Sequence, residues 1–398
     1  MWQVHRTMRI EEIKFQIRQV IKQAVQSIVL PVCYMAERFR KINPKLVIFA
    51  DAHHNSRPAS MEVLYRKLKK DGSWKIVETY LDYGTAGAGA VAKHSMGFMK
   101  LYAQAGFVVI CDNFLPAASC RKRQGTKVIQ LWHACGCYKK FGYDAKDDIP
   151  ENYHAGNVYR NTDLVTVSGE AAVGPFASAM RLPRECVMPL GVSRTDLYFS
   201  QAWKQRCTER FYQEHPEAAG RKVVLWAPTF RGNAGAPEAV SMDLARLQKQ
   251  LGNGYYVLAR LHPHMMHDTG NYYCSIPTEE LYPVIDILIA DYSSLIYEYL
   301  LTGSGLVLYV PDLESYSTGR GFYMDISEIP GEIVTDESNL AEAVLRAASA
   351  SERSSLGEDK ASQTGRKEKR EQFLKTYMNR CDGRATERIV SWMRSNVK

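Results

Sequence analysis

The stretch PVIDILIADYSSLIYEYLLTGSG, residues 283–305, joins a predicted strand to a predicted helix through a short polar turn. Residues 285–290 are almost continuously apolar, as in a strand that is covered on both faces. From Leu295 the apolar residues recur at helical spacing, and Gly303 stands where a C-cap is expected. The tetrad 291–294 (DYSS) therefore lies at a helix N-terminus, where free N–H groups, the helix dipole and two hydroxyls suit an anion. The alternative is that one serine is only an N-cap.

The composition describes a folded protein that is large enough for two domains. The chain has 398 residues, of which 45% are hydrophobic and 24% charged, and this balance excludes a disordered chain. The net charge of +8 favours anionic partners such as nucleotides, phosphorylated polymers, nucleic acid or acidic lipids. Nine cysteines without the spacing of a disulfide scaffold indicate reduced thiols. Because neither a signal peptide nor a run of about 20 apolar residues is evident, we expect a cytoplasmic protein that contacts membranes only at its surface.

Short apolar runs alternate with helical patterns along both halves of the chain, which predicts parallel α/β sheets. Strands are expected at 46–50, 76–81, 107–111, 128–132, 164–167, 223–226, 256–261, 285–290 and 306–310. Helices are expected at 59–70, 91–103, 242–251 and 339–350. The predicted fold class is α/β, with two doubly wound halves that face each other across a cleft. Ligands then bind at the carboxyl ends of the strands, between the halves.

Both ends of the chain carry basic helical patterns. Residues 10–30 show an apolar stripe opposite basic residues, so this helix either packs on its own domain or lies on an anionic membrane. A polar link at 349–365 precedes a second basic helical stretch at 367–394. The predicted division is a basic N-terminal helix (1–43), a first Rossmann-like domain (44–192), a second Rossmann-like domain (193–350) and a basic C-terminal helical tail (351–398).

Polar residues directly follow four of the predicted strands, at the sheet edge where α/β proteins collect their chemistry. These clusters are His133, Thr229-Phe230-Arg231, His262-Pro263-His264 and Asp291–Ser294. His133 is a candidate general base, because an imidazole titrates near neutral pH. Its alternative is a core histidine with a satisfied ring. Arg231 and His262 offer donors for a diphosphate, and the alternative for Arg231 is a surface salt bridge.

Other kinds of site are not supported by the sequence. The pair Cys135 and Cys137 and the group His262, His264 and His267 do not match the spacing of a zinc site, so we expect no metal. A Walker loop and a G-x-G-x-x-G motif after a strand are both missing, which argues against a kinase or a dehydrogenase. The glycine-rich segment 84–89 is interpreted as a loop at the mouth of the cleft.

Six motifs occur in a fixed order within about residues 45–345. They read VIQLWHACGCYKKFGYD (128–144), GVSRTDLY (191–198), VVLWAPTFRG (223–232), LARLHPHM (258–265), DILIADYSSLIYEYLLTG (286–303) and GFYMDISEIPGEIV (321–334). Their combination resembles the CDP-glycerol glycerophosphotransferase family of teichoic-acid synthesis. The resemblance implies two facing Rossmann-like domains of the GT-B type. It also implies transfer of an alditol phosphate from a CDP-alditol to a membrane-linked polymer or primer.

The resemblance also implies roles for single residues. His133 matches the general base of the family, and Glu298 and Asp291 are candidates for the donor ribose and cytidine, although Asp291 is expected mainly to orient its turn. The residues that match the surroundings of the donor diphosphate are Arg231, His262, Ser293 and Ser294. Two departures stand out. The family reads His-Gly-Thr-Pro where this chain has the residues 133–136 (HACG), and it has Pro in place of Ser193.

The residues and the resemblance lead to one mechanism. The base deprotonates an acceptor hydroxyl, which attacks the β-phosphorus of the donor, and CMP leaves while the phosphate-binding groups hold the charge. Helix-end donors can do this without a divalent ion, so no cofactor is expected. The expected partners are a CDP-alditol, a lipid-linked acceptor and the anionic inner face of the cell membrane, to which the basic chain ends would hold a peripheral enzyme.

Three alternatives differ in class. A GT-B glycosyltransferase would use a nucleotide-sugar, since a fold does not fix a function. A non-catalytic module for anionic polymers would explain the basic ends and the altered HACG motif. Nucleic-acid binding is favoured only by charge, and no nucleic-acid-binding motif is recognisable, so no nucleic acid is expected as a partner. The choice between glycerol and ribitol, between primase and polymerase, and of acceptor is left open.

Overall fold

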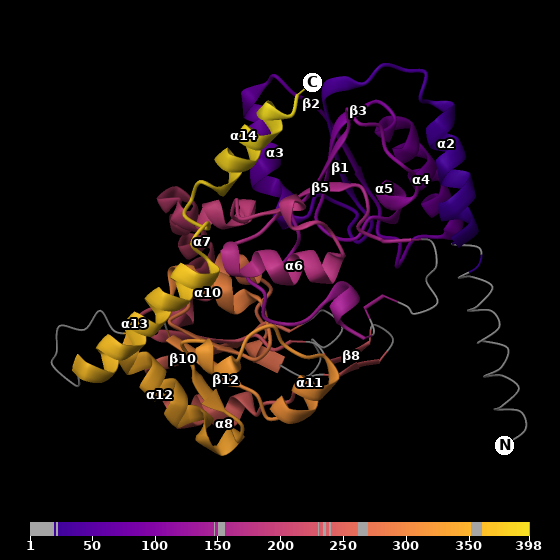
Figure 1. The fold of residues 1–398 in the computed structure, drawn as a ribbon. Helices are drawn as coiled ribbons and strands as arrows, with labels where there is room; N and C mark the ends of the chain where they lie inside the picture. The colour runs from indigo at the N-terminus through magenta and orange to yellow at the C-terminus, as the bar shows by residue number, and fades with distance from the viewer. Residues whose placement is uncertain are drawn as a thin grey trace, which may run out of the picture.

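Two parallel β-sheets, one in each half of the chain, organise the molecule (Figure 1). The structure is a computed structural model. It describes residues 20, 23–146, 148–149, 156–229, 231–233, 236–238, 240–261, 270–303, 305–351 and 360–397.

The first sheet has six parallel strands in the order β2-β1-β3-β4-β5-β6. Its strands are β1 (Asn43–Asp51), β2 (Lys75–Tyr80), β3 (Ala105–Ile110), β4 (Lys127–Gln130), β5 (Thr162–Thr166) and β6 (Val187–Met188). Alternate residues of β1 serve opposite faces: Ile48 joins the core under α2 (Leu30–Ala36) and α4 (Ala88–Tyr102). Val47 and Phe49 instead join the core under α3 (Ala59–Asp71). Both faces are therefore covered, as the apolar run of this strand predicts.

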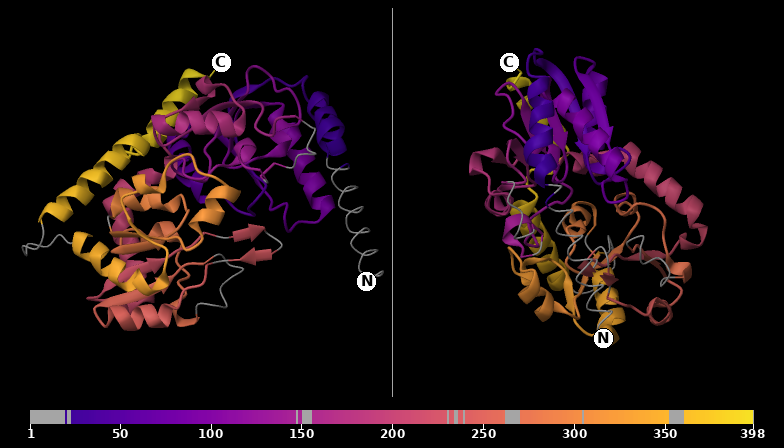
Figure 2. Two further views of the ribbon diagram at one scale, coloured as in Figure 1. Left: turned by 60° about the horizontal axis from the view of Figure 1, so that its bottom comes forward. Right: turned by 90° about the vertical axis from the view of Figure 1, so that its right-hand side faces the viewer.

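The second sheet has five parallel strands in the order β10-β7-β11-β12-β13. Its strands are β7 (Lys222–Trp226), β10 (Tyr255–Ala259), β11 (Ile287–Ala290), β12 (Gly305–Tyr309) and β13 (Glu332–Val334). On one face pack α8 (Leu244–Leu251) and α12 (Leu340–Ser351). The other face packs against α10 (Leu295–Thr302), the helix that follows the DYSS tetrad. A short antiparallel hairpin of β8 (Arg231–Asn233) and β9 (Ala236–Glu238) projects from this half (Figure 2).

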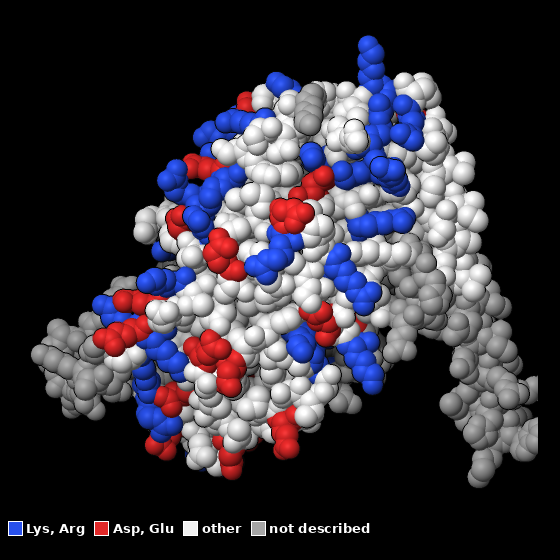
Figure 3. Space-filling model, viewed as in Figure 1, with Lys and Arg blue, Asp and Glu red and all other residues white. Residues whose placement is uncertain are grey.

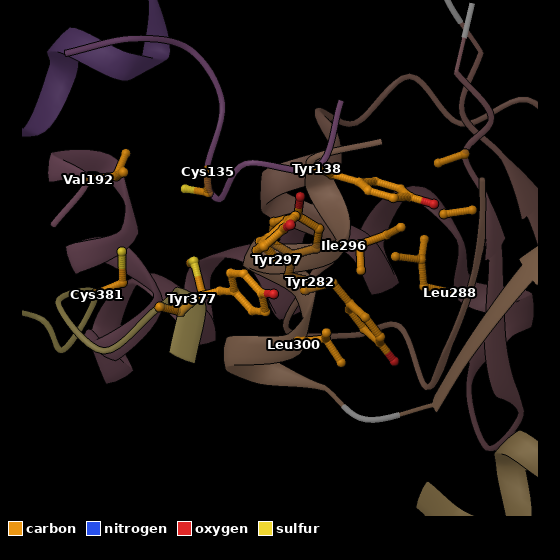
Figure 4. Close-up of a cluster of buried hydrophobic side chains, with 14 of the residues drawn as sticks. Cys135, Tyr138, Val192, Tyr282, Leu288, Ile296, Tyr297, Leu300, Tyr377 and Cys381 are labelled. Atoms are coloured by element: carbon orange, nitrogen blue, oxygen red, sulfur yellow. The ribbon is translucent and has the colours of Figure 1, made fainter. Parts of the chain in front are cut away.

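One hydrophobic core crosses from the first half to the second. It contains Cys135 and Tyr138 from the segment after β4 together with Ile296 and Tyr297 of α10 (Figure 4). Gly136 makes this contact possible, because a Cβ atom at its position would lie 2.1 Å from the ring of Tyr297. The loop that carries His133 is thus packed directly against the helix that begins at the tetrad.

All nine predicted strands are present, with ends that differ by a few residues. The very short strands β6, β8, β9 and β13 were not predicted, because two or three residues carry too little pattern. Helices that the sequence did not resolve are α5 (Leu115–Ala118), α6 (Val173–Met180), α7 (Gln201–Glu214), α9 (Thr278–Leu281) and α11 (Leu313–Gly319). The glycine-rich segment is a loop only as far as Gly87, where α4 has its N-cap. The crossing between the halves contains the 3-10 helix η5 (Ser193–Phe199).

The C-terminal segment, predicted as a basic helical tail, forms two helices that pack on the folded body. Helix α13 (Lys360–Tyr377) contacts α10 in the second half, and α14 (Ala385–Ser395) returns to the first half beside α3 (Figures 1 and 2). Ile389, Val390 and Met393 lie in the core of the first sheet, because the apolar stripe of α14 finds a partner there. Most of the predicted N-terminal helix lies outside the described residues. Among the helices that are described, none has the length and apolarity needed to cross a bilayer.

Candidate active site

His133 stands at the carboxyl end of β4 with an aspartate beside it. Its Nδ1 lies 3.2 Å from Oδ2 of Asp112, which follows β3. The same nitrogen lies 3.4 Å from the carbonyl oxygen of Cys111. With the proton on Nδ1, the ring is oriented by Asp112 and Nε2 is the basic nitrogen. The His133 side chain is 51% exposed, so it can meet a substrate. It is not the core histidine of the alternative interpretation.

The backbone before His133 explains why its ring points outward. Trp132 has a φ of +57°, a left-handed conformation that a bulky residue rarely adopts. Its N–H donates to Oε1 of Gln130 at 3.1 Å, and its buried ring stacks on the imidazole with centroids 4.4 Å apart. The strained turn thus buries the indole and presents the imidazole at the surface, an arrangement typical of functional sites.

Further titratable groups gather at the same edge. Nε2 of His53 lies 4.0 Å from Oδ1 of Asp112, and Nδ1 of His54 lies 2.9 Å from Oδ2 of the buried Asp51. Burial tends to raise the pKa of Asp112, but the hydrogen bond from His133 and the charges of His133 and His53 hold that pKa below its usual value. Sequence reasoning missed Asp112, His53 and His54. The signal was present, since all three follow predicted strands.

In the second half, Asp291 fixes the tetrad from within. It is 2% exposed and accepts hydrogen bonds from the N–H groups of Thr229 at 2.8 Å and of Tyr292 at 2.6 Å. Nη1 of Arg231 donates to it at 2.7 Å. These donors occupy both oxygens of Asp291. The side chain therefore orients the turn, which was the role expected from the sequence. A direct contact of Asp291 with ribose or cytidine is not supported.

Arg231 lies beside the tetrad, as predicted, but two carboxylates hold it. Nε and Nη2 donate to Asp312 at 2.8 and 3.1 Å, in addition to the bond with Asp291. The guanidinium carbon lies 4.8 Å from the ring centroids of both Tyr292 and Tyr316. Burial opposes the charge, but the hydrogen bonds and charges of the two aspartates raise the pKa of Arg231, which therefore stays charged. Only 11% of the Arg231 side chain is exposed. To bind a phosphate, Arg231 would have to give up its hydrogen bonds to Asp312.

Both serines of the tetrad are half-buried at the start of α10. Oγ of Ser293 accepts from the N–H of Leu295 at 3.4 Å, a long bond. Ser294 is the N-cap residue, yet its side chain makes no capping hydrogen bond. The alternative that a serine only caps the helix therefore has little support, and both hydroxyls are placed to donate to an anion. His262, the other predicted phosphate ligand, lies outside the described residues.

Glu298 does not fit the predicted contact with the donor ribose. It is 4% exposed, and its oxygens accept from Nε and Nη2 of Arg194 and from the hydroxyl of Tyr198. Nη1 of Arg194 also donates to Ser60 of α3 at 2.8 Å. Burial opposes the carboxylate, but Arg194 keeps the pKa of Glu298 below its usual value. This buried ion pair joins α10 to the first half and is closed to a ligand.

The loop that starts at His133 reaches the second half and is held there. The ring of Tyr138 stacks on that of Phe322 at 4.9 Å, and the carbonyl of Tyr138 accepts from the N–H of Tyr323 at 2.9 Å. Cys135 lies beside Cys381 of the C-terminal segment (Figure 4). Within the described ranges, no group of three or more His, Cys, Asp or Glu side chains is arranged to hold a metal ion.

The chain matches one protein family over nearly its whole length. Residues 32–394 fit the model of the family described as CDP-Glycerol:Poly(glycerophosphate) glycerophosphotransferase. The chain belongs to this family. The prediction of a transferase of the CDP-glycerol family is thereby confirmed.

Curated relatives of this glycerophosphotransferase act in teichoic-acid synthesis. The teichoic acid ribitol-phosphate primase of Bacillus spizizenii is 32% identical over 367 residues, which cover 88% of this chain and 90% of the primase. The teichoic acid ribitol-phosphate polymerase TarL of Staphylococcus aureus is 28% identical, over 86% of this chain and 61% of the polymerase. The chain thus spans most of the primase but less than two thirds of this polymerase.

The fold of this family member also has a solved counterpart. The structure of the wall teichoic acid polymerase TagF superposes with a TM-score of 0.73 at 20% identity, covering 96% of this chain and 97% of that one. A variant of the same polymerase, soaked with CDPG, gives a TM-score of 0.74. The predicted GT-B arrangement of two facing α/β halves is confirmed.

Proposed function

We propose that this chain transfers glycerol phosphate or ribitol phosphate from a CDP-alditol to a hydroxyl group of a lipid-linked primer or polymer, with release of CMP. The observation that carries this proposal is one continuous loop. It begins at an exposed histidine that is oriented by an aspartate, and it passes the DYSS tetrad, where the ring centroid of Tyr138 lies 6.5 Å from that of Tyr292. A base and a phosphate-binding site are thus fixed to one another.

The chemistry follows from this placement. Nε2 of His133 removes the proton of the acceptor hydroxyl, while Asp112 stabilises the imidazolium that forms. The acceptor oxygen bonds to the β-phosphorus, and the bond from that phosphorus to the oxygen of CMP breaks with its electrons on CMP. The hydroxyls of Ser293 and Ser294 donate to the phosphate oxygens as charge shifts, and the positive end of the α10 dipole favours that charge. Because these donors are all protein groups, we propose that added chelators leave the rate unchanged.

The choice between a primase and a polymerase is open, because the chain resembles both kinds of enzyme. It is 32% identical to the ribitol-phosphate primase, and 32% and 28% identical to two ribitol-phosphate polymerases. A primase adds one or a few alditol phosphates, whereas a polymerase adds many, so the mass of the product separates them.

We further propose that the enzyme binds the anionic inner face of the cell membrane through the segment from Ile28 to Lys41. Ile28, Val32 and Phe39 are 63%, 63% and 79% exposed. Ile28 and Val32 lie one helical turn apart, and Phe39 lies in the turn after α2. The exposed cations Arg38, Arg40, Lys41 and Lys45 follow directly. Figure 3 shows Lys and Arg gathered at the upper right, over the loop after α2. An apolar stripe beside cations is typical of a surface that docks on acidic lipids.

The deciding experiment is a donor panel. The chain is incubated with CDP-glycerol, CDP-ribitol, UDP-sugars or CMP-sugars together with a lipid-linked disaccharide or short-polymer acceptor, and CMP release and product mass are measured. Release of CMP from one CDP-alditol, with the acceptor heavier by one alditol phosphate, is expected. Turnover of a nucleotide-sugar while both CDP-alditols stay inert would contradict the proposal and favour a glycosyltransferase.

A further inference from the structure

The segment 138–140 of the His133 loop is clamped by the second half at the edge of the phosphate site. Lys139 forms a backbone bridge with Phe322, and the N–H of Lys140 donates to the carbonyl of Gly321 at 3.1 Å. Nε of Arg320 donates in turn to the carbonyl of Lys140 at 3.1 Å. Because these bonds fix the backbone on both sides, the side chain of Lys139 starts from a defined place beside the tetrad.

Charged groups from four elements face the Lys139 ammonium. They are Arg320 from the end of α11, Arg231 of β8, Asp291 of the tetrad and Asp148 from the segment after Asp144. Asp291 is engaged by Arg231, and Asp148 accepts from Nη2 of Arg320 at 2.8 Å. Over the described part of the chain, no carboxylate lies within ion-pair distance of Lys139 and no hydrogen bond of its ammonium occurs. Burial, followed by the charge of Arg320, lowers the pKa of Lys139 to about 8.

We infer that Lys139 is a donor-binding residue whose ammonium contacts the diphosphate of the CDP-alditol. This inference rests on the proposed function and names a residue that its mechanism did not use. A partly buried cation without a counter-ion is unfavourable, and a diphosphate that binds at the tetrad supplies the missing negative charge. Arg231 already has two carboxylate partners and Lys139 has none among the described residues. Lys139 is therefore the cation that can meet the donor without first breaking an ion pair.

The position of Lys139 couples donor binding to the base. It lies six residues after His133 on the loop that crosses between the halves. A phosphate held by Lys139 is thereby tied to the backbone that positions the imidazole. Proximity of this kind raises the rate by fixing the geometry of the reacting groups.

The test compares Lys139→Met with Lys140→Met, a matched control that removes the same charge from the neighbouring residue. Binding of CDP and of cytidine is measured by calorimetry, and KM and kcat are measured with the CDP-alditol that the wild-type enzyme turns over. Lys139→Met should weaken CDP binding about 10–100-fold and raise the donor KM similarly, with cytidine binding unchanged. Lys140→Met should behave as the wild type.

The pH dependence gives a second readout. Wild-type affinity for CDP should fall as the pH rises through about 8, where Lys139 loses its proton. Lys139→Arg should bind CDP without this alkaline loss, since a guanidinium stays charged. At pH 7 the Lys139→Met variant should unfold at a higher temperature than the wild type. The folded wild type keeps a charged ammonium partly buried, whereas water solvates that ammonium better in the unfolded state. That difference should shrink above pH 8.

Several results overturn the inference. They are equal CDP affinity of the Lys139→Met and Lys140→Met variants, an unchanged alkaline loss in Lys139→Arg, or a melting temperature of Lys139→Met below that of the wild type, which would indicate a structural cation. If the wild-type enzyme releases no CMP from any CDP-alditol, the proposed function fails instead, and the CDP and cytidine titrations still report on Lys139.

Discussion

The carboxyl ends of the two sheets are built differently. At the first sheet the key side chain is exposed: His133 is 51% exposed and has one carboxylate beside it. At the second sheet the key side chain is enclosed: Arg231 is 11% exposed and is held by Asp291 and Asp312. In the proposed mechanism His133 can therefore meet an acceptor hydroxyl directly, whereas Arg231 must give up at least one ion pair before it can hold a phosphate. The comparison thus distinguishes His133, which is proposed to accept a proton, from Arg231, whose charge is held in place by two carboxylates.

Replacing the exposed base should have the largest effect. His133→Ala removes the proton acceptor and should lower kcat about 10²–10⁴-fold, whereas its melting temperature should stay near that of the wild type because the ring is half exposed. Steady-state CMP release and circular dichroism measure the two quantities. Unchanged turnover would contradict an acceptor-side base at His133, whereas the absence of CMP release from the wild type as well would favour the non-catalytic polymer-binding module.

Glu298 should matter for stability instead of donor binding. Glu298→Ala leaves Arg194 buried without its partner and should cost about 3–5 kcal/mol of unfolding free energy. Chemical denaturation measures this loss. At a temperature where the variant is folded, its donor KM should equal that of the wild type. A raised donor KM with normal stability would restore the ribose contact that the sequence predicted.

Asp112 should act through His133. Asp112→Asn keeps the shape but removes the charge that stabilises the imidazolium, and we expect kcat to fall about 10–100-fold with an unchanged donor KM. A merely structural role would lower the melting temperature and move both kinetic constants together. His54→Asn serves as a control, since His54 pairs with Asp51 and does not contact His133.

The smallest effect is expected from removing one of the two ion pairs of Arg231. Asp312→Asn removes one of the two carboxylates on Arg231, so less interaction is lost when a phosphate takes its place. The donor KM should fall a few-fold, with kcat little changed. A rise in the donor KM would show that Asp312 holds Arg231 in its productive position instead of competing with the donor.

Much of the architecture could be predicted because it depends on local sequence patterns. Apolar runs that alternate with helical stripes gave the nine longer strands, and the DYSS tetrad was correctly placed between β11 and α10. The prediction failed where an element is too short to show a period, as in β6, or where an apolar stripe finds a distant partner. Helix α14 is the clearest case. Its apolar stripe packs on the first sheet, and the N–H of Thr386 donates to Asp196 of η5, 190 residues away in the chain.

The residues of the candidate site show the same contrast between local patterns and long-range contacts. His133, Arg231, Ser293 and Ser294 could be proposed because each belongs to a polar cluster that follows a predicted strand. Glu298 was misassigned, because its partner Arg194 is 104 residues away and only the packed structure brings them together.

The sequence by itself determined the fold class, the family and the residue types at the strand ends, because these depend on local periodicity and on motifs that are contiguous in the chain. Only the tertiary structure decided which of those residues are open to a ligand. Exposure and pairing depend on contacts between segments far apart in the sequence. These contacts enclose Glu298 and Arg231, set Asp112 beside His133, and bring Lys139 near Asp291 of the tetrad, with no carboxylate partner in the described part of the chain.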